Sequence, residues 1–243
     1  MWCGRGSARV MAPSVQEFAA MSDAPRTLAV LCAAMDQAER EAGRATGAVT
    51  LVAVSKTHDS DAIRPFLQAG LRVFGENRVQ EAKTKWPELK QDFPQTELHL
   101  IGPLQTNKVR DAVALFDVIE TIDRPKLARV VADEIQRLGH GPRCLVQVNI
   151  GREAQKAGID PDQTAALVDL CRREYGLTIS GLMCIPPAEG DPVPHFRRLA
   201  ELAKDLGLAE ISMGMSGDFP AAIACGATHI RVGSALFGQR DHH

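Results

Sequence analysis

Lys56 closes an apolar stretch, residues 49–57, that runs Val-Thr-Leu-Val-Ala-Val-Ser-Lys-Thr. β-Branched residues dominate this stretch and no proline interrupts it, which is typical of a parallel strand buried on both faces. A lysine at the carboxyl end of such a strand lies where parallel sheets and barrels build their ligand sites. Partial removal from water would let its amine attack a carbonyl group and form a Schiff base. The alternative is a lysine that extends from the strand end into water.

Two turns near the C terminus offer groups that bind phosphate. Ser216 and Gly217 precede a predicted helix that begins near Asp218, and Gly233 and Ser234 precede a short closing helix. Each turn presents backbone N–H groups and a hydroxyl at a helix start, where anions bind. Helix capping would explain either turn alone. Together with an amine on the first strand, the two turns favour a phosphorylated aldehyde, and pyridoxal 5'-phosphate fits that description.

Arg231, at the end of the last predicted strand, would lie near the ring of such a cofactor. A cation at that position disfavours protonation of the pyridine nitrogen, so the cofactor would be a weak electron sink. Pairing of Arg231 with a carboxylate inside the fold is the open alternative.

Alternating strand and helix patterns position these residues. Strand patterns occupy eight segments, 49–55, 72–75, 97–102, 117–122, 143–150, 179–185, 210–213 and 229–232. Helix patterns occupy 25–43, 59–69, 77–86, 106–114, 125–138, 161–175, 194–206 and 218–225. Eight strands that alternate with helices predict an α/β fold, a (β/α)8 TIM barrel with an extra N-terminal helix. A doubly wound sheet is the alternative, weakened because no G-x-G-x-x-G follows the first strand.

In a barrel the site lies at the carboxyl ends of the strands, and these ends are polar in this sequence. The first strand delivers Lys56 there, the second Glu76 and Asn77, and the fifth Asn149. A run of Gln105, Asn107 and Lys108 follows the third strand, and three interpretations of it stay open. These residues could line the cofactor mouth, contact a client protein or cap a helix, and Lys108 could receive the cofactor during release.

The composition is that of an ordinary globular protein and excludes several classes. The 243 residues carry a net charge of −2, with 24% charged and 45% hydrophobic residues, so there is no basic field for nucleic acid. No apolar run is long enough for a transmembrane helix. The six cysteines are scattered without zinc spacing, which predicts no metal site and reduced thiols in the cytoplasm. Residues 25–243 are expected to form one domain, and residues 1–24 a disordered extension or a start assigned too early.

Six ordered motifs carry a family resemblance. They are residues 53–56, 74–81, 99–108, 181–183, 212–218 and 231–233, which include the sequences Ala-Val-Ser-Lys, Phe-Gly-Glu-Asn and His-Leu-Ile-Gly-Pro-Leu-Gln-Thr-Asn-Lys. In these segments, from about residue 28 to 238, the chain resembles the pyridoxal phosphate homeostasis protein family. Two departures are visible: His58 and Asp59 follow Thr57 where the family often has a proline, and Ser234 stands where threonine is common.

The resemblance implies a barrel like the N-terminal cofactor domain of alanine racemase, with pyridoxal phosphate bound to Lys56 as a Schiff base. It places Asn77 near the ring and Arg231 at the pyridine nitrogen. The phosphate-binding residues that it implies are Ser216, Gly233 and Ser234.

The resemblance also implies a non-catalytic protein that maintains vitamin B6 and the balance of amino and keto acids. Racemisation needs two bases, and in racemases the second is a tyrosine from a separate β domain of the partner subunit. The single tyrosine, Tyr175, is expected at a helix end opposite Lys56, and Cys184 is more plausible as a buried structural residue. His99 and His229 are expected in the core or at the bottom face.

We therefore expect a monomer that holds pyridoxal phosphate and passes it to apo-enzymes as transient clients. A monomeric pyridoxal-phosphate-dependent amino-acid racemase is the alternative, and a structural or adaptor role is a third class.

Overall fold

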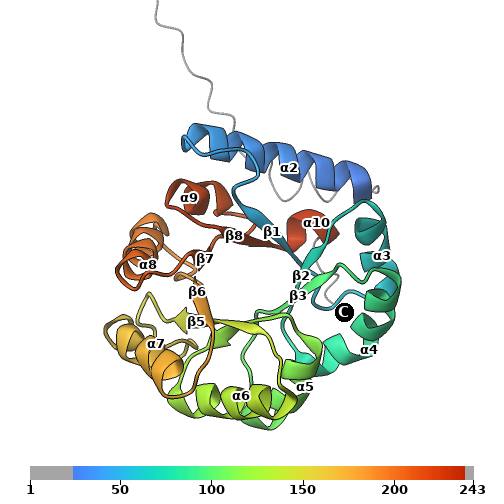
Figure 1. Cartoon of the computed structure of the whole chain (residues 1–243). Helices are drawn as coiled ribbons and strands as arrows, with labels where there is room; N and C mark the ends of the chain where they lie inside the picture. Colours follow the sequence, from blue (N-terminus) through green and yellow to red (C-terminus); the bar gives the residue numbers. More distant parts are fainter. Residues whose placement is uncertain (1–23, 239–243) are drawn as a thin grey trace, which may run out of the picture.

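Eight parallel strands close into a barrel in the computed structural model, which describes residues 24–238 (Figure 1). The strands follow one another around the barrel in chain order, and β8 pairs with β1 with Val52 opposite Arg231. They are β1 (Thr50–Val54), β2 (Val73–Glu76), β3 (Glu97–Leu100), β4 (Val118–Ile122), β5 (Arg143–Val148), β6 (Ile179–Cys184), β7 (Glu210–Ser212) and β8 (His229–Val232). The prediction of a (β/α)8 barrel is confirmed.

Helices form an outer ring around the strands (Figure 1). They are α2 (Ala24–Glu41), α3 (Ser60–Gln68), α4 (Val79–Asp92), η1 (Thr106–Lys108), α5 (Val109–Leu115), α6 (Pro125–Leu138), η2 (Pro161–Gln163), α7 (Thr164–Arg173), α8 (Val193–Asp205), α9 (Phe219–Ala224) and α10 (Ser234–Phe237). The main apolar core lies between this ring and the strands, as expected for strands that are covered on their outer face.

The N-terminal helix α2 lies across the outside of the barrel beside α9, α10 and α3 (Figure 1). It begins at Ala24, one residue before the predicted start, and the expectation for residues 1–23 falls outside the described residues. Leu31 and Met35 bury its apolar face. The buried carboxylate of Glu39 accepts hydrogen bonds from the N–H groups of Gly47 and Val49, both at 2.7 Å. This helix therefore fixes the entry of the chain into β1.

Helix α4 extends six residues beyond its predicted end at residue 86. Pro87 lies inside this helix, although a proline lacks the N–H group that an interior helical position uses. Trp86 and Leu89 on either side of it are fully buried, whereas Pro87 lies on the exposed face. Burial of these two large side chains outweighs the cost of one interior proline, about 3 kcal/mol.

The barrel interior contains a buried ionic network near the amino ends of the strands. His99 Nδ1 lies 2.6 Å from Glu120 Oε1, and His99 Nε2 lies 2.8 Å from Glu97 Oε1. Burial opposes the charge of His99, but the two carboxylates prevail and raise its pKa to about 9. Although burial acts in the opposite direction, hydrogen bonding and attraction by His99 hold the Glu120 pKa at about 2. His229 is buried nearby, and desolvation lowers its pKa. The expectation that both histidines lie inside the fold is met.

Within residues 24–238, no helix has the length and apolarity needed to span a membrane.

Candidate functional site

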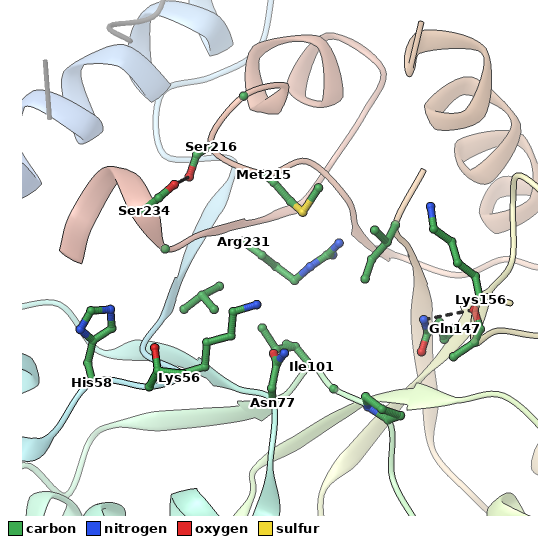
Figure 2. Close-up of a pocket in the computed structure, with 18 of the residues that line it drawn as sticks. Lys56, His58, Asn77, Ile101, Gln147, Lys156, Met215, Ser216, Arg231 and Ser234 are labelled. Carbon is green, nitrogen blue, oxygen red and sulfur yellow. Dashed lines mark hydrogen bonds between the residues drawn. The ribbon is translucent and has the colours of Figure 1, made fainter. Parts of the chain in front are cut away.

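A cavity of about 590 Å³ opens at the carboxyl ends of the strands. Its volume falls in the range typical of small-molecule sites, roughly 300–1,000 Å³. The six residues that the sequence predicted to bind the cofactor all line this cavity, namely Lys56, Asn77, Ser216, Arg231, Gly233 and Ser234. Figure 2 shows the labelled side chains among them converging on the cavity from different parts of the barrel.

Lys56 enters the cavity because of strand alternation. Val54 also lines the cavity, and Lys56, two residues later, falls on the same face. Its aminoalkyl chain extends into the cavity toward Arg231 (Figure 2). The next residue, Thr57, has φ of 68°, which is uncommon for a β-branched side chain and turns the chain away toward α3. The strand end and this turn together place the amine among polar neighbours.

Arg231 lines the cavity and also belongs to the buried network, so its pairing with a buried carboxylate does not remove it from the cavity. Its side chain is only 3% exposed. The guanidinium donates to Ser212 Oγ at 2.6 Å and to the carbonyl oxygen of Cys184 at 2.7 Å. Ser212 Oγ in turn donates to Glu120 Oε2 at 2.6 Å, and the Arg231 Nη1–Glu120 Oε2 distance is 3.9 Å. These contacts hold a cation in a fixed orientation at the cavity floor.

The two serine turns meet at the cavity wall. Ser234 Oγ donates to Ser216 Oγ at 3.2 Å (Figure 2). No hydrogen bond between described residues uses the backbone N–H groups of Ser216, Gly217 or Ser234. A Cβ atom on Gly233 would lie 3.1 Å from the Val54 carbonyl oxygen, so glycine permits this close approach. Two hydroxyls and three backbone amides without a partner among the described residues therefore belong to residues that line one cavity.

The helices after these two turns are short, as the sequence predicted for the closing helix. Helices α9 and α10 have only six and four residues, so the turns supply local donors rather than the end of a long helix dipole. Asp218 does not cap α9; its Oδ1 accepts from the Met215 N–H at 2.5 Å and closes the preceding turn.

Comparison with known proteins identifies the family. A protein of Vibrio cholerae serotype O1 named pyridoxal phosphate homeostasis protein is 43% identical over 224 residues, which cover 87% of this chain and 94% of that protein. The Escherichia coli protein of the same name is 38% identical over 240 residues, 91% of this chain and 99% of that protein. The chain belongs to the pyridoxal phosphate homeostasis protein family. The resemblance predicted from the motifs is thereby confirmed.

Two further comparisons support membership of this family. Residues 31–241 match the family described as alanine racemase, N-terminal domain. Among solved structures, PipY of Synechococcus elongatus with PLP bound is 39% identical, with a TM-score of 0.76 over 88% of this chain and all of that chain. The predicted likeness to the alanine racemase barrel is confirmed.

The sequence did not single out Gln147 and Lys156, which line the opposite side of the cavity (Figure 2). Lys156 lies in the loop after β5 and donates to the Pro186 carbonyl oxygen at 2.9 Å. Asn149, expected at the strand end, holds this loop instead: its side chain exchanges hydrogen bonds with the backbone of Glu153 at 2.8 and 3.1 Å. No periodicity marks a loop lysine as a cavity residue.

Glu76 was also expected at the site but points the other way. Its side chain faces the helix layer, where Oε1 accepts from Trp86 Nε1 at 3.0 Å. Gly75 and Asn77, its neighbours in sequence, belong to the inner face. Glu76 therefore supports the site from outside the barrel.

Gln105, Asn107 and Lys108 are not among the described residues that line the cavity. Gln105 and Asn107 are exposed, and η1 begins there without a side-chain cap from Gln105. In the described part of the chain, no group of three or more histidine, cysteine and acidic residues is arranged to hold a metal ion.

Proposed function

We propose that this protein binds pyridoxal phosphate in the cavity, attached to Lys56, and keeps it in store for other proteins without turning over a substrate. The observation that carries the proposal is the convergence of an amine, a fixed guanidinium and a hydroxyl-and-amide cluster on one cavity. The cofactor-bound structure of the relative PipY and the names of the close relatives support it.

The donor set matches the chemical groups of this cofactor. Pyridoxal phosphate supplies an aldehyde that reacts reversibly with a lysine amine, and Lys56 would supply that amine. The hydroxyls of Ser216 and Ser234, with the amides of their turns, would hold the phosphate, and Gly233 lets it approach the backbone. Asn77 would lie beside the ring. The aldehyde, the phosphate and the ring of the cofactor would therefore each have a partner residue in the cavity.

Arg231 favours storage over catalysis. Its hydrogen bonds to Ser212 and the Cys184 carbonyl, together with Glu120 nearby, fix a permanent cation in the cavity. A cation facing the pyridine nitrogen opposes its protonation and so weakens the electron withdrawal on which amino-acid chemistry depends.

The racemase alternative lacks a suitable second base at the positions considered from the sequence. Burial raises the Cys184 pKa to about 12, so its thiol stays protonated near neutral pH. Tyr175 follows α7 and precedes the amino end of β6, which is the end of the barrel away from Lys56. We expect no exchange of the α-hydrogen of amino acids with solvent deuterium.

We further propose that the protein acts in the cytoplasm as a monomer and that pyridoxal-phosphate-dependent apo-enzymes are its transient clients. Five free cysteines among residues 24–238 suit a reducing compartment.

The test is to incubate the protein with pyridoxal phosphate, reduce it with borohydride and map the modified peptide by mass spectrometry. We expect the label on Lys56 and no deuterium exchange in added alanine. A label confined to surface lysines would refute the attachment, and Lys56-dependent exchange would establish the enzyme instead.

A further inference from the structure

A buried lysine outside the barrel holds the turn that carries Lys56. Lys85 on α4 is 5% exposed. Its Nζ donates to the carbonyl oxygen of Ser55 at 2.9 Å and to that of His58 at 2.8 Å. These two carbonyls stand immediately before Lys56 and immediately after Thr57. One ammonium group thus spans the turn at both ends.

Glu81 on the same helix completes the hold on this turn. Its Oε1 accepts the N–H of Thr57 at 2.5 Å and that of the Lys85 ammonium at 2.9 Å. Thr57 has φ of 68°, a conformation that a β-branched residue keeps only when its surroundings impose it. The Lys85–Glu81 pair therefore imposes the backbone conformation that directs the Lys56 side chain inward.

The Lys85 ammonium group lies beside a buried carboxylate, that of Glu76. Its fully buried Oε1 accepts from Ser55 Oγ at 2.5 Å and lies 2.9 Å from Lys85 Nζ, whereas its Oε2 has no hydrogen-bond partner. A buried carboxylate needs a compensating charge. Lys85 thus neutralises Glu76 and holds the turn with the same ammonium group.

We propose that Lys85, with Glu81, is a positioning residue for Lys56: it fixes the turn so that the Lys56 amine points into the cavity. This inference rests on the proposed attachment of pyridoxal phosphate to Lys56. It also accounts for the acidic residues of the Gly-Glu-Asn-Arg-Val-Gln-Glu segment, residues 75–81, of which only Asn77 lines the cavity.

The experiment compares Lys85→Met with Lys83→Met, an exposed lysine two residues earlier on α4. Hydrogen exchange of residues 55–58 is measured without cofactor, because the Thr57 and His58 amides are hydrogen-bonded in the turn. The rate of pyridoxal phosphate loading is followed by absorbance, and the loaded lysine is mapped after reduction. For Lys85→Met we expect faster exchange at these amides and loading of Lys56 slowed by about 10- to 100-fold. Lys83→Met should match the parent in both measurements.

Glu81 provides the second test if Lys85→Met does not fold. Glu81→Ala should change exchange and loading in the same directions. Glu81→Gln keeps an acceptor for the Thr57 N–H and should load within a factor of about three of the parent. Glu88→Gln, an exposed carboxylate on the same helix, is the matched control.

Unchanged exchange and unchanged loading in Lys85→Met or Glu81→Ala would overturn the positioning role. The positioning role would also be overturned if Glu81→Gln loaded pyridoxal phosphate as slowly as Glu81→Ala. Failure of the parent to load would instead refute the proposed function, and amide exchange alone would then decide whether Lys85 holds the turn.

Discussion

His99 gives the barrel a stability that depends on pH, and the structure sets both its size and its pH range. The imidazole is 1% exposed and lies between Glu97 and Glu120, which raise its pKa from 6.5 to about 9. At about 1.36 kcal/mol per pKa unit, this difference contributes about 3 kcal/mol to the free energy of unfolding. Because the folded-state pKa is the higher one, the contribution is complete below pH 6.5 and is lost as the pH rises through 9.

The assay is urea unfolding of the parent and of His99→Gln at several pH values between about 6.5 and 9.5. The parent-minus-variant difference in unfolding free energy should fall by about 3 kcal/mol over this range, with about half of the loss reached near pH 8. His229, whose pKa is lowered, acts below pH 6.5 and so does not overlap. A parent-minus-variant difference that is constant from pH 6.5 to 9.5 would refute the charged His99 network.

Three further substitutions and one chemical modification test the site and its surroundings. Gly102→Ala would place a Cβ atom in collision with the Asn77 carbonyl oxygen, and we expect urea unfolding to show a loss of about 1–3 kcal/mol; unaltered stability would contradict the packing. Ser216→Ala and Ser234→Ala should each weaken binding of pyridoxal phosphate by about tenfold, measured by equilibrium titration, because each removes a hydroxyl donor to a charged group; parental affinity in both would exclude the phosphate assignment. Cys184 should resist iodoacetamide at about pH 8 until urea unfolds the protein, as mass spectrometry would show, and rapid labelling of the folded protein would contradict its burial.

The barrel was predictable because its signals are local. Most strands are short segments rich in apolar residues, and a turn and a helix follow them. This alternation can be recognised even when a boundary is wrong by a few residues. The position of the site followed from the same alternation, since carboxyl ends of parallel strands gather at one end of a barrel. Lys56, Asn77 and Arg231 therefore reached one cavity as expected.

The contacts that support the site could not be predicted, because they join residues that are far apart in the sequence and meet only in the folded protein. Nothing in the sequence near Lys85 indicates that its ammonium group reaches Ser55 and His58, thirty and twenty-seven residues away. Glu76 faces the helices because side chains alternate along β2, and an error of one residue in the strand register reverses that orientation. Lys156 reaches the cavity through a loop whose path has no periodic signal.

The central claim is that Lys56 attaches pyridoxal phosphate. The direct measurement is the absorbance spectrum between about 300 and 500 nm of the purified protein, before and after incubation with pyridoxal phosphate, beside Lys56→Ala and the exposed-lysine control Lys126→Ala. We expect a band at about 420 nm in the parent and in Lys126→Ala that is missing in Lys56→Ala. A parent that stays colourless after incubation, or a Lys56→Ala protein with an undiminished band, would contradict the account.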